Sequence, residues 1–222
     1  MLFNSYEFIC FFLPVTAVIF FTLVKLRLIK VAIYWLTISS ILFYGYWNPA
    51  YGPLLIVSVI GNFCFGKYLS TANSQNFYNK VILWLGIGFN LGMLGYYKYS
   101  AFLISSLNQF FNTNWSITEI LLPLGISFYS FTQIAYLVDA YRSDAKDCNY
   151  DPLSYILFVV FFPQLIAGPI LRHDQLIPEL QNRKNYIFDH KNVAMGITLF
   201  ILGLAKKVLI ADNIAPWVAH VF

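Results

Sequence analysis

The sequence predicts an all-α, polytopic integral membrane protein with about six or seven hydrophobic segments, one of them broken or re-entrant. Of the 222 residues, 59% are hydrophobic and only 11% are charged, whereas a soluble domain carries about a quarter charged residues. Apolar runs recur at roughly the 20-residue length that a bilayer-crossing helix needs. Basic residues fall at the ends of these runs, which is the distribution that orients membrane proteins.

Composition and motifs also exclude several kinds of function. The net charge of +4 is not gathered in a basic stripe, which argues against a nucleic-acid partner. Cys10, Cys64 and Cys148 are scattered, so neither a metal site nor a disulfide framework is indicated. Phosphate-binding loops, dinucleotide fingerprints, zinc-protease motifs and nucleophile elbows are missing. We therefore assign no catalytic residue, no metal ligand and no bound cofactor.

The first two apolar runs set the orientation of the chain. Phe8 to Val24 lacks the basic leader and cleavage site of a signal peptide, which indicates a retained helix. Lys25, Arg27 and Lys30 then form a purely basic loop before the second run, Val31 to Tyr46. Because such loops stay in the cytoplasm, we expect the N-terminus to face outward.

An uncharged turn rich in aromatic residues, 47–53, indicates the outer headgroup layer. It leads into the third run, Leu54 to Tyr68. Lys67 and Lys80 flank a polar stretch that returns the chain to the cytoplasmic side. The fourth run, Val81 to Tyr97, then crosses outward.

A belt of three tyrosines surrounds Lys98 at the end of the fourth run. In the segment 102–111 that follows, the apolar residues share one helical face, which predicts a helix lying along the membrane interface. The fifth run extends from Ile117 to about Val138 and ends in Asp139 and Arg142. Three residues apart on a helix, these two side chains could pair, either as a weak exposed ion pair or within a polar cluster at a cavity mouth.

The sixth run, Leu153 to Leu171, predicts a broken segment. Four residues interrupt it: Pro163, Gln164, Gly168 and Pro169. A helix broken there would leave backbone groups unpaired in lipid, so the segment should be covered by protein or line a wet cavity. A simple crossing would also place the basic loop Arg172 to Lys191 outside, against the charge rule. A re-entrant segment keeps both ends in the cytoplasm.

The last run, Val193 to Ile210, leaves two possibilities open. Lys206 and Lys207 lie near its external end, so either this run is partly inserted or the lysines occupy a protein-lined polar region. No internal repeat or linker is present. We therefore expect residues 1–222 to form a single membrane domain.

Polar residues near the apolar runs are candidates for lining a substrate path, because ions at membrane depth usually face a cavity or a partner. The donors of Arg172 suit phosphate or carboxylate, with snorkelling to headgroups as the alternative, and Lys98 has the same two alternatives. Gln164 either contacts substrate or satisfies the broken backbone. His173 is either a base or a solvated loop residue. The candidate substrate-binding residues are Lys98, Asp139, Arg142, Gln164 and Arg172.

Several motifs resemble the membrane-bound O-acyltransferase family, specifically its alginate O-acetyltransferase branch. The resemblance covers essentially the whole chain in family order and looks like the N-terminal part of such a protein. The motifs that carry it are Phe43 to Trp47, Leu94 to Tyr99, Leu122 to Phe131, Tyr136 to Arg142, Phe161 to Arg172 and Gly203 to Asp212, together with the opening Phe3-Asn4-Ser5.

This resemblance implies a multi-pass protein of the cell inner (cytoplasmic) membrane. It implies transfer of an acyl group, acetyl in this branch, from a cytoplasmic donor to hydroxyls of an extracytoplasmic polysaccharide such as alginate, with a periplasmic or membrane-anchored acetylation partner besides membrane lipid. The family's histidine, its general base, lies beyond the equivalent of Phe222. We therefore expect the 222-residue chain to be inactive alone.

Two other functions remain open from the residues. A broken apolar segment flanked by cations also suits a transporter or flippase component, although no repeated half is evident. A non-catalytic membrane scaffold that docks a periplasmic acetylation partner is the other alternative.

Overall fold

The computed structural model describes residues 3–71, 77–115, 120–142, 150–166, 168 and 172–219. These residues form helices and turns without a strand, which confirms the all-α prediction. Two compact units make up the chain. We call Ile33–Gln181 the first unit, and Met1–Ala32 together with Asn182–Phe222 the second unit. Each unit is described by itself. The single membrane domain expected over 1–222 stays a prediction.

Within the described residues, five helical stretches are long and apolar enough to cross a membrane. They coincide with the first four predicted runs and with the last, which confirms a polytopic membrane protein. The stretches are Glu7–Lys25, Ile29–Trp47, Pro49–Thr71, Phe77–Phe111 and His190–Trp217.

The helices differ in length and regularity, and three π-helical turns adjoin them: η1 precedes α1, η3 follows α4 and η5 follows α10. In chain order the elements are η1 (Glu7–Phe12), α1 (Leu13–Lys25), α2 (Ile29–Trp47), the 3-10 turn η2 (Pro49–Tyr51), α3 (Gly52–Thr71), α4 (Phe77–Leu94), η3 (Gly95–Tyr99), α5 (Ser100–Phe111), α6 (Ile126–Arg142), α7 (Pro152–Val160), α8 (Phe162–Leu165), α9 (His173–Gln181), the 3-10 turn η4 (Arg183–Tyr186), α10 (His190–Ala205), η5 (Lys206–Ala211) and α11 (Asp212–Ala219).

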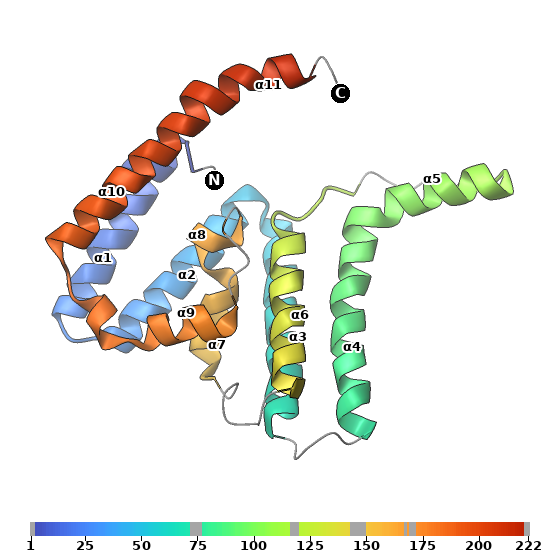
Figure 1. Ribbon diagram of the computed structural model, residues 1–222, viewed down its shortest axis with the longest axis horizontal. Coiled ribbons are helices and arrows are strands. Elements are labelled where there is room, and N and C mark those ends of the chain that lie inside the picture. Colours follow the sequence, from blue (N-terminus) through green and yellow to red (C-terminus); the bar gives the residue numbers. More distant parts are fainter. Residues whose placement is uncertain are drawn as a thin grey trace. The chain divides into compact units, whose positions relative to one another are not determined.

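Helices α3, α4 and α6 pack against one another in the first unit (Figure 1). Small residues permit this close approach, as is usual where membrane helices meet. A Cβ at Gly66 of α3 would overlap the ring of Tyr136, and a Cβ at Gly86 of α4 would lie 2.6 Å from Leu137 Cδ1. Tyr136 and Leu137 are both fully buried. The two glycines therefore set how closely α3 and α4 approach α6.

An uncharged polar cluster also joins these three helices in their buried centre. Ser58 Oγ donates to Gln133 Oε1 over 3.0 Å, and Asn62 Nδ2 donates to the same oxygen. Asn90 Nδ2 donates to Asn62 Oδ1 over 2.6 Å. All four side chains are fully buried. Because no water is available to them in the bilayer core, they satisfy their hydrogen-bonding groups with one another.

Helix α5 turns aside from α4 at the tyrosine belt (Figure 1). The π-helical turn η3 joins them, and Tyr99, with φ −113° and ψ −3°, leaves regular helical geometry. The apolar residues Phe102, Phe110 and Phe111 are exposed on α5. A helix that departs from its crossing helix with an exposed apolar face agrees with the predicted position along the interface.

The fifth run begins its helix later than expected. Helix α6 starts at Ile126, and residues 120–125 are not helical, whereas the run extends back to Ile117 in sequence. Gly125 has φ +69°, and a Cβ there would lie 2.5 Å from Leu165 O. Pro123, which lacks a backbone N–H, and the left-handed Gly125 together delay the helix. This backbone turn is what brings α6 against α8.

The sixth run is broken, as predicted. Helix α7 ends at Val160, Phe161 leaves the helix with φ −53° and ψ +110°, and the short α8 follows. Protein covers the segment, because Leu157, Phe158 and Phe162 are buried. The freed backbone finds a partner in another helix, since Phe162 N donates to Ser40 Oγ of α2 over 3.3 Å. Of its four predicted interruptions, Pro169 lies outside the described residues.

Aromatic contacts hold the second unit together. Phe8 and Phe200 lie 6.3 Å apart between ring centroids, Phe20 and Tyr186 lie 5.9 Å apart, and Phe21 and Phe188 lie 4.9 Å apart. Helix α10 continues through η5 into α11 without a break. Lys206 and Lys207 therefore lie inside a longer helix, and Lys207 Nζ pairs with Asp212 Oδ2 at 2.7 Å.

We expect Gly66→Ala to lower the stability of the membrane domain by about 1–3 kcal/mol, because the added methyl group displaces the buried Tyr136 ring. Thermal unfolding in a mild detergent measures the change. Gly88→Ala is the matched control, since a Cβ at Gly88 meets no atom within 4 Å. Equal unfolding temperatures of the two variants would contradict a glycine-dependent contact between α3 and α6.

Cysteines at Pro152 and Gln175 should be labelled from the same side of the membrane, because the broken segment is expected to return to the side where it starts. Both positions are exposed. A cysteine at exposed Ala50, in the turn after α2, should react from the opposite side. An impermeant thiol reagent applied to cells and to inverted vesicles measures this. Labelling of Pro152→Cys and Gln175→Cys from opposite sides of the membrane would contradict the re-entrant topology.

Candidate functional site

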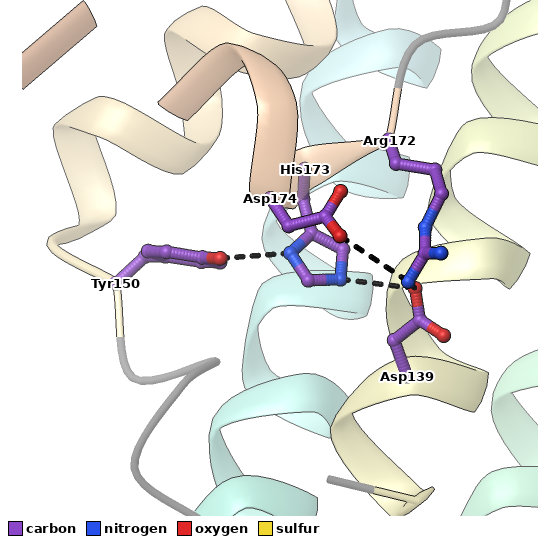
Figure 2. A network of polar contacts seen from close by, with 5 residues as sticks. All are labelled: Asp139, Tyr150, Arg172, His173 and Asp174. Carbon is purple, nitrogen blue, oxygen red and sulfur yellow. Dashed lines mark hydrogen bonds and ion pairs between the residues drawn. The ribbon is translucent and has the colours of Figure 1, made fainter. Parts of the chain in front are cut away.

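Five polar side chains meet where the broken segment begins and ends. Asp139 projects from the last turns of α6, Tyr150 precedes α7, and Arg172, His173 and Asp174 lie at the start of α9 (Figure 2). We call these five residues the α6–α9 cluster. The chain leaves the cluster at Tyr150 and comes back to it at Arg172.

The carboxylate of Asp139 is the centre of the cluster. Its Oδ2 accepts from Arg172 Nη2 over 3.0 Å and from His173 Nε2 over 3.1 Å. Arg172 Nη2 also lies 3.4 Å from Asp174 Oδ2. On the far side of the imidazole, Tyr150 OH lies 2.8 Å from His173 Nδ1 (Figure 2). Both ends of the broken segment are therefore tied to α6 through one histidine.

Burial decides the charge of this histidine. The His173 side chain is 5% exposed, and desolvation lowers its pKa, opposed by the neighbouring Asp139 carboxylate. The neutral imidazole has one donor and one acceptor nitrogen. We assign the proton to Nε2, which donates to Asp139, so that Nδ1 accepts from the Tyr150 hydroxyl. The ring of Tyr136 packs edge-on against it, with centroids 5.6 Å apart.

This arrangement positions groups rather than supplying a free base. Both ring nitrogens of His173 are engaged, so the imidazole cannot take a substrate proton without losing a hydrogen bond. Arg172 differs, because its side chain is 57% exposed and has five N–H donors. Arg172 Nη2 faces the carboxylates of Asp139 and Asp174, and the exposure of the side chain leaves part of the guanidinium open to solvent or a ligand.

The structure brings only two of the predicted site residues together. Asp139 pairs with Arg172, whereas the pairing considered between Asp139 and Arg142 does not form. Arg142 ends α6 with an exposed side chain. The reason is geometric: Arg172 and His173 approach Asp139 from α9 and occupy its carboxylate.

Lys98 and Gln164 lie elsewhere in the first unit. Lys98 Nζ lies 3.4 Å from Ser127 Oγ at the first turn of α6, and 5.4 Å from the Tyr99 ring centroid. At 1.5 Å per residue, Ser127 and Asp139 are about 18 Å apart along α6. Gln164 faces a cavity of about 10 Å³ beside Tyr129 and Thr132, room for about one water molecule. Lys98 of η3 and Gln164 of α8 thus lie beside the first turns of α6, whereas Asp139 and Arg172 meet near its other end.

The sequence pattern does not indicate that His173 is a central residue, and it does not single out Tyr150 at all. His173 resembles a solvated loop residue because it follows Arg172 in a polar stretch. One feature of the sequence could have indicated its role. His173 lies directly after the interrupted run, where a segment that returns to α6 needs a contact that holds it. The burial that makes it a central residue arises only when α7 and α9 pack together.

Comparison with known proteins shows similarity along the whole chain. A peptidoglycan O-acetyltransferase of Helicobacter pylori is 35% identical over 241 aligned residues, covering 97% of this chain and 45% of that protein. A probable alginate O-acetylase AlgI of Pseudomonas putida is 34% identical over 226 residues, covering 100% of this chain and 45% of that protein. The corresponding protein of Pseudomonas aeruginosa is also 34% identical.

The chain spans less than half the length of these curated relatives. No protein-family model matches it, and no solved structure shows significant similarity to it. The resemblance inferred from the motifs, to membrane-bound O-acyltransferases of the alginate O-acetyltransferase branch, is confirmed by these relatives.

Lowering the pH should destabilise the protein through His173. Its folded pKa lies below the ordinary value of 6.5, so the unfolded chain binds the proton first and stability falls as the pH drops through about 6.5. His173→Gln, which cannot titrate, should remove that part of the pH dependence. Unfolding temperatures measured at pH 7.5 and 5.5 give the comparison. An unchanged pH dependence in the variant would contradict a buried neutral imidazole.

Proposed function

We propose, from the premise that this chain is a homologue of membrane-bound O-acetyltransferases, that it forms part of an enzyme that acetylates an extracytoplasmic polysaccharide. The observation that carries the proposal is the similarity over the whole chain to relatives named for acetylation of alginate or peptidoglycan. The enzyme would take acetyl groups from a cytoplasmic donor and transfer them to sugar hydroxyls. Such a reaction needs a path across the membrane.

The two polar ends of α6 suit the two ends of such a path. Arg172, half-exposed beside Asp139, offers donors to an anionic acetyl donor at the cytoplasmic end. Lys98, beside Ser127, lies at the other end, where a polysaccharide hydroxyl would arrive. Gln164 lies on the broken segment, with Oε1 buried and without a hydrogen-bond partner among the described residues. In this proposal the side-chain amide of Gln164 is a polar group that lines the path.

The α6–α9 cluster supports the proposed path because it holds the broken segment in one position. A path through protein at membrane depth requires irregular backbone, which lipid does not tolerate unless it is covered. Asp139 and His173 hold the two ends of the broken segment against α6. Asp139 and His173 are therefore positioning residues, and the exposed Arg172 is the contact residue.

In this proposal the 222-residue chain supplies positioning and binding groups but no general base for the sugar hydroxyl. The three histidines of the sequence are His173, His190 and His220. His173 is fully engaged, His190 is exposed against Phe188, with centroids 4.9 Å apart, and His220 lies outside the described residues. We propose that this chain alone does not transfer acetyl groups and that a periplasmic or membrane-anchored partner delivers the modification to the polymer.

Deleting the gene that carries this chain should remove ester-linked acetate from the extracytoplasmic polysaccharide of the producing cell. Mild alkali releases that acetate for measurement, and the intact gene should restore it. The gene carrying Arg172→Gln should restore at least about tenfold less acetate than the intact gene, because the substitution removes a charge-assisted contact with the acetyl donor. Lys80→Gln, exposed and distant in sequence, is the control.

Purified chain reconstituted in vesicles gives the complementary test. With radiolabelled acetyl-coenzyme A as the probe and alginate or peptidoglycan fragments as acceptors, it should transfer no label above a protein-free control. Undiminished polysaccharide acetate in the deleted cell would overturn the proposed function. Label transfer by the isolated chain would overturn only its proposed dependence on further protein.

A further inference from the structure

We infer that the second unit holds an acidic phospholipid in a cavity between α1, the start of α2 and the segment that precedes α10. The cavity has a volume of about 1220 Å³, above the roughly 300–1,000 Å³ of common small-ligand pockets. It lies wholly within one compact unit, since its lining comes from residues 17–31 and 186–193. This inference is independent of the proposed acetyl transfer.

The wall of the cavity is apolar. Val18 and Val31 are exposed to 65% and 47% although they line it, as does exposed Ile187. Phe21 and Phe188 close one side with their rings edge to face. An open apolar concavity of this size on a membrane protein is a surface for hydrocarbon chains.

The rim of the cavity is cationic. Lys25, Arg27 and Lys30 are all exposed and all line it. Among the described residues of the lining none is acidic. The nearby carboxylate of Asp189 is used locally, because its Oδ1 accepts from Lys191 N over 2.9 Å at the start of α10.

A tight turn fixes the rim. Arg27 has φ +61°, and Arg27 N and Leu28 N donate to Val24 O and Leu23 O over 2.9 and 3.0 Å. This left-handed closure ends α1 and starts the reversal into α2. A positive φ is unfavourable for arginine, so the sequence accepts a backbone cost here and keeps a cation where glycine would be easier.

Apolar wall and cationic rim together match one kind of ligand. Acyl chains suit the wall, and a phosphate with net negative charge suits three cations on the predicted cytoplasmic side, where anionic headgroups attract basic residues. A free phosphate would leave the apolar wall uncovered. A zwitterionic lipid would leave the cations without net counter-charge. The occupant that satisfies both surfaces is an anionic phospholipid such as phosphatidylglycerol.

Lipid retention tests this inference. The purified chain is reconstituted with phosphatidylcholine and phosphatidylglycerol in equal amounts, extracted in detergent, and its bound lipids are counted by mass spectrometry. Wild-type protein should retain phosphatidylglycerol selectively. The variant with Lys25→Gln, Arg27→Gln and Lys30→Gln should retain at least about fivefold less. Ala17→Trp, which fills the wall and keeps every charge, should also lose it, so the test does not depend on correct insertion of the triple variant.

The control removes three exposed cations outside the cavity lining: Lys67→Gln, Lys80→Gln and Lys206→Gln. It should retain as much phosphatidylglycerol as wild type. Equal loss in this control would show general charge attraction and overturn the site. Full retention by Ala17→Trp, or displacement of the lipid by inorganic phosphate, would overturn it as well, as would equal retention of phosphatidylcholine by wild type.

Discussion

One carboxylate, that of Asp139, accepts hydrogen bonds from both Arg172 and His173, and the position of the broken segment depends on it. A chain that interrupts its helix among apolar helices must cover its free backbone groups with protein. Here α7 meets that constraint by packing against α3 and α6, and α8 by contacting α2. The α6–α9 cluster holds the segment where it starts and where it ends. Removing the carboxylate would leave a guanidinium and a buried imidazole without their shared acceptor.

The rest of the first unit is arranged around α6. Its buried face carries Gln133 for the polar cluster, Tyr136 against Gly66, and Leu137 against Gly86. Within the next turn it presents Asp139 to Arg172 and to His173 of α9. Successive turns of a single helix therefore determine helix spacing, register and the anchoring of the broken segment. A change in its rotation would disturb all three together.

The relatives and the geometry bear on function in different ways. Similarity across the whole chain identifies membrane O-acetyltransferases as homologues, and the geometry proposes which residues serve an enzyme of that kind. The cluster contains a carboxylate, an imidazole and a guanidinium, three group types that also occur in catalytic sites. Both ring nitrogens of His173 are engaged in hydrogen bonds, so the cluster supports the broken segment and offers no free base for proton transfer.

The sequence by itself determined the class of the protein: apolar run length fixed the membrane helices, Pro163 and its neighbours predicted the break, and the ordered motifs identified the relatives. It also marked Asp139 and Arg172 as functional candidates. It did not determine that these two residues pair, that Arg142 stays exposed, or that His173 is buried. Those features were decided by the tertiary structure, because they join α6 to a segment more than thirty residues later in the chain. Local periodicity reports which face of a helix is apolar, but the partner of a side chain across such a distance is chosen only when the helices pack.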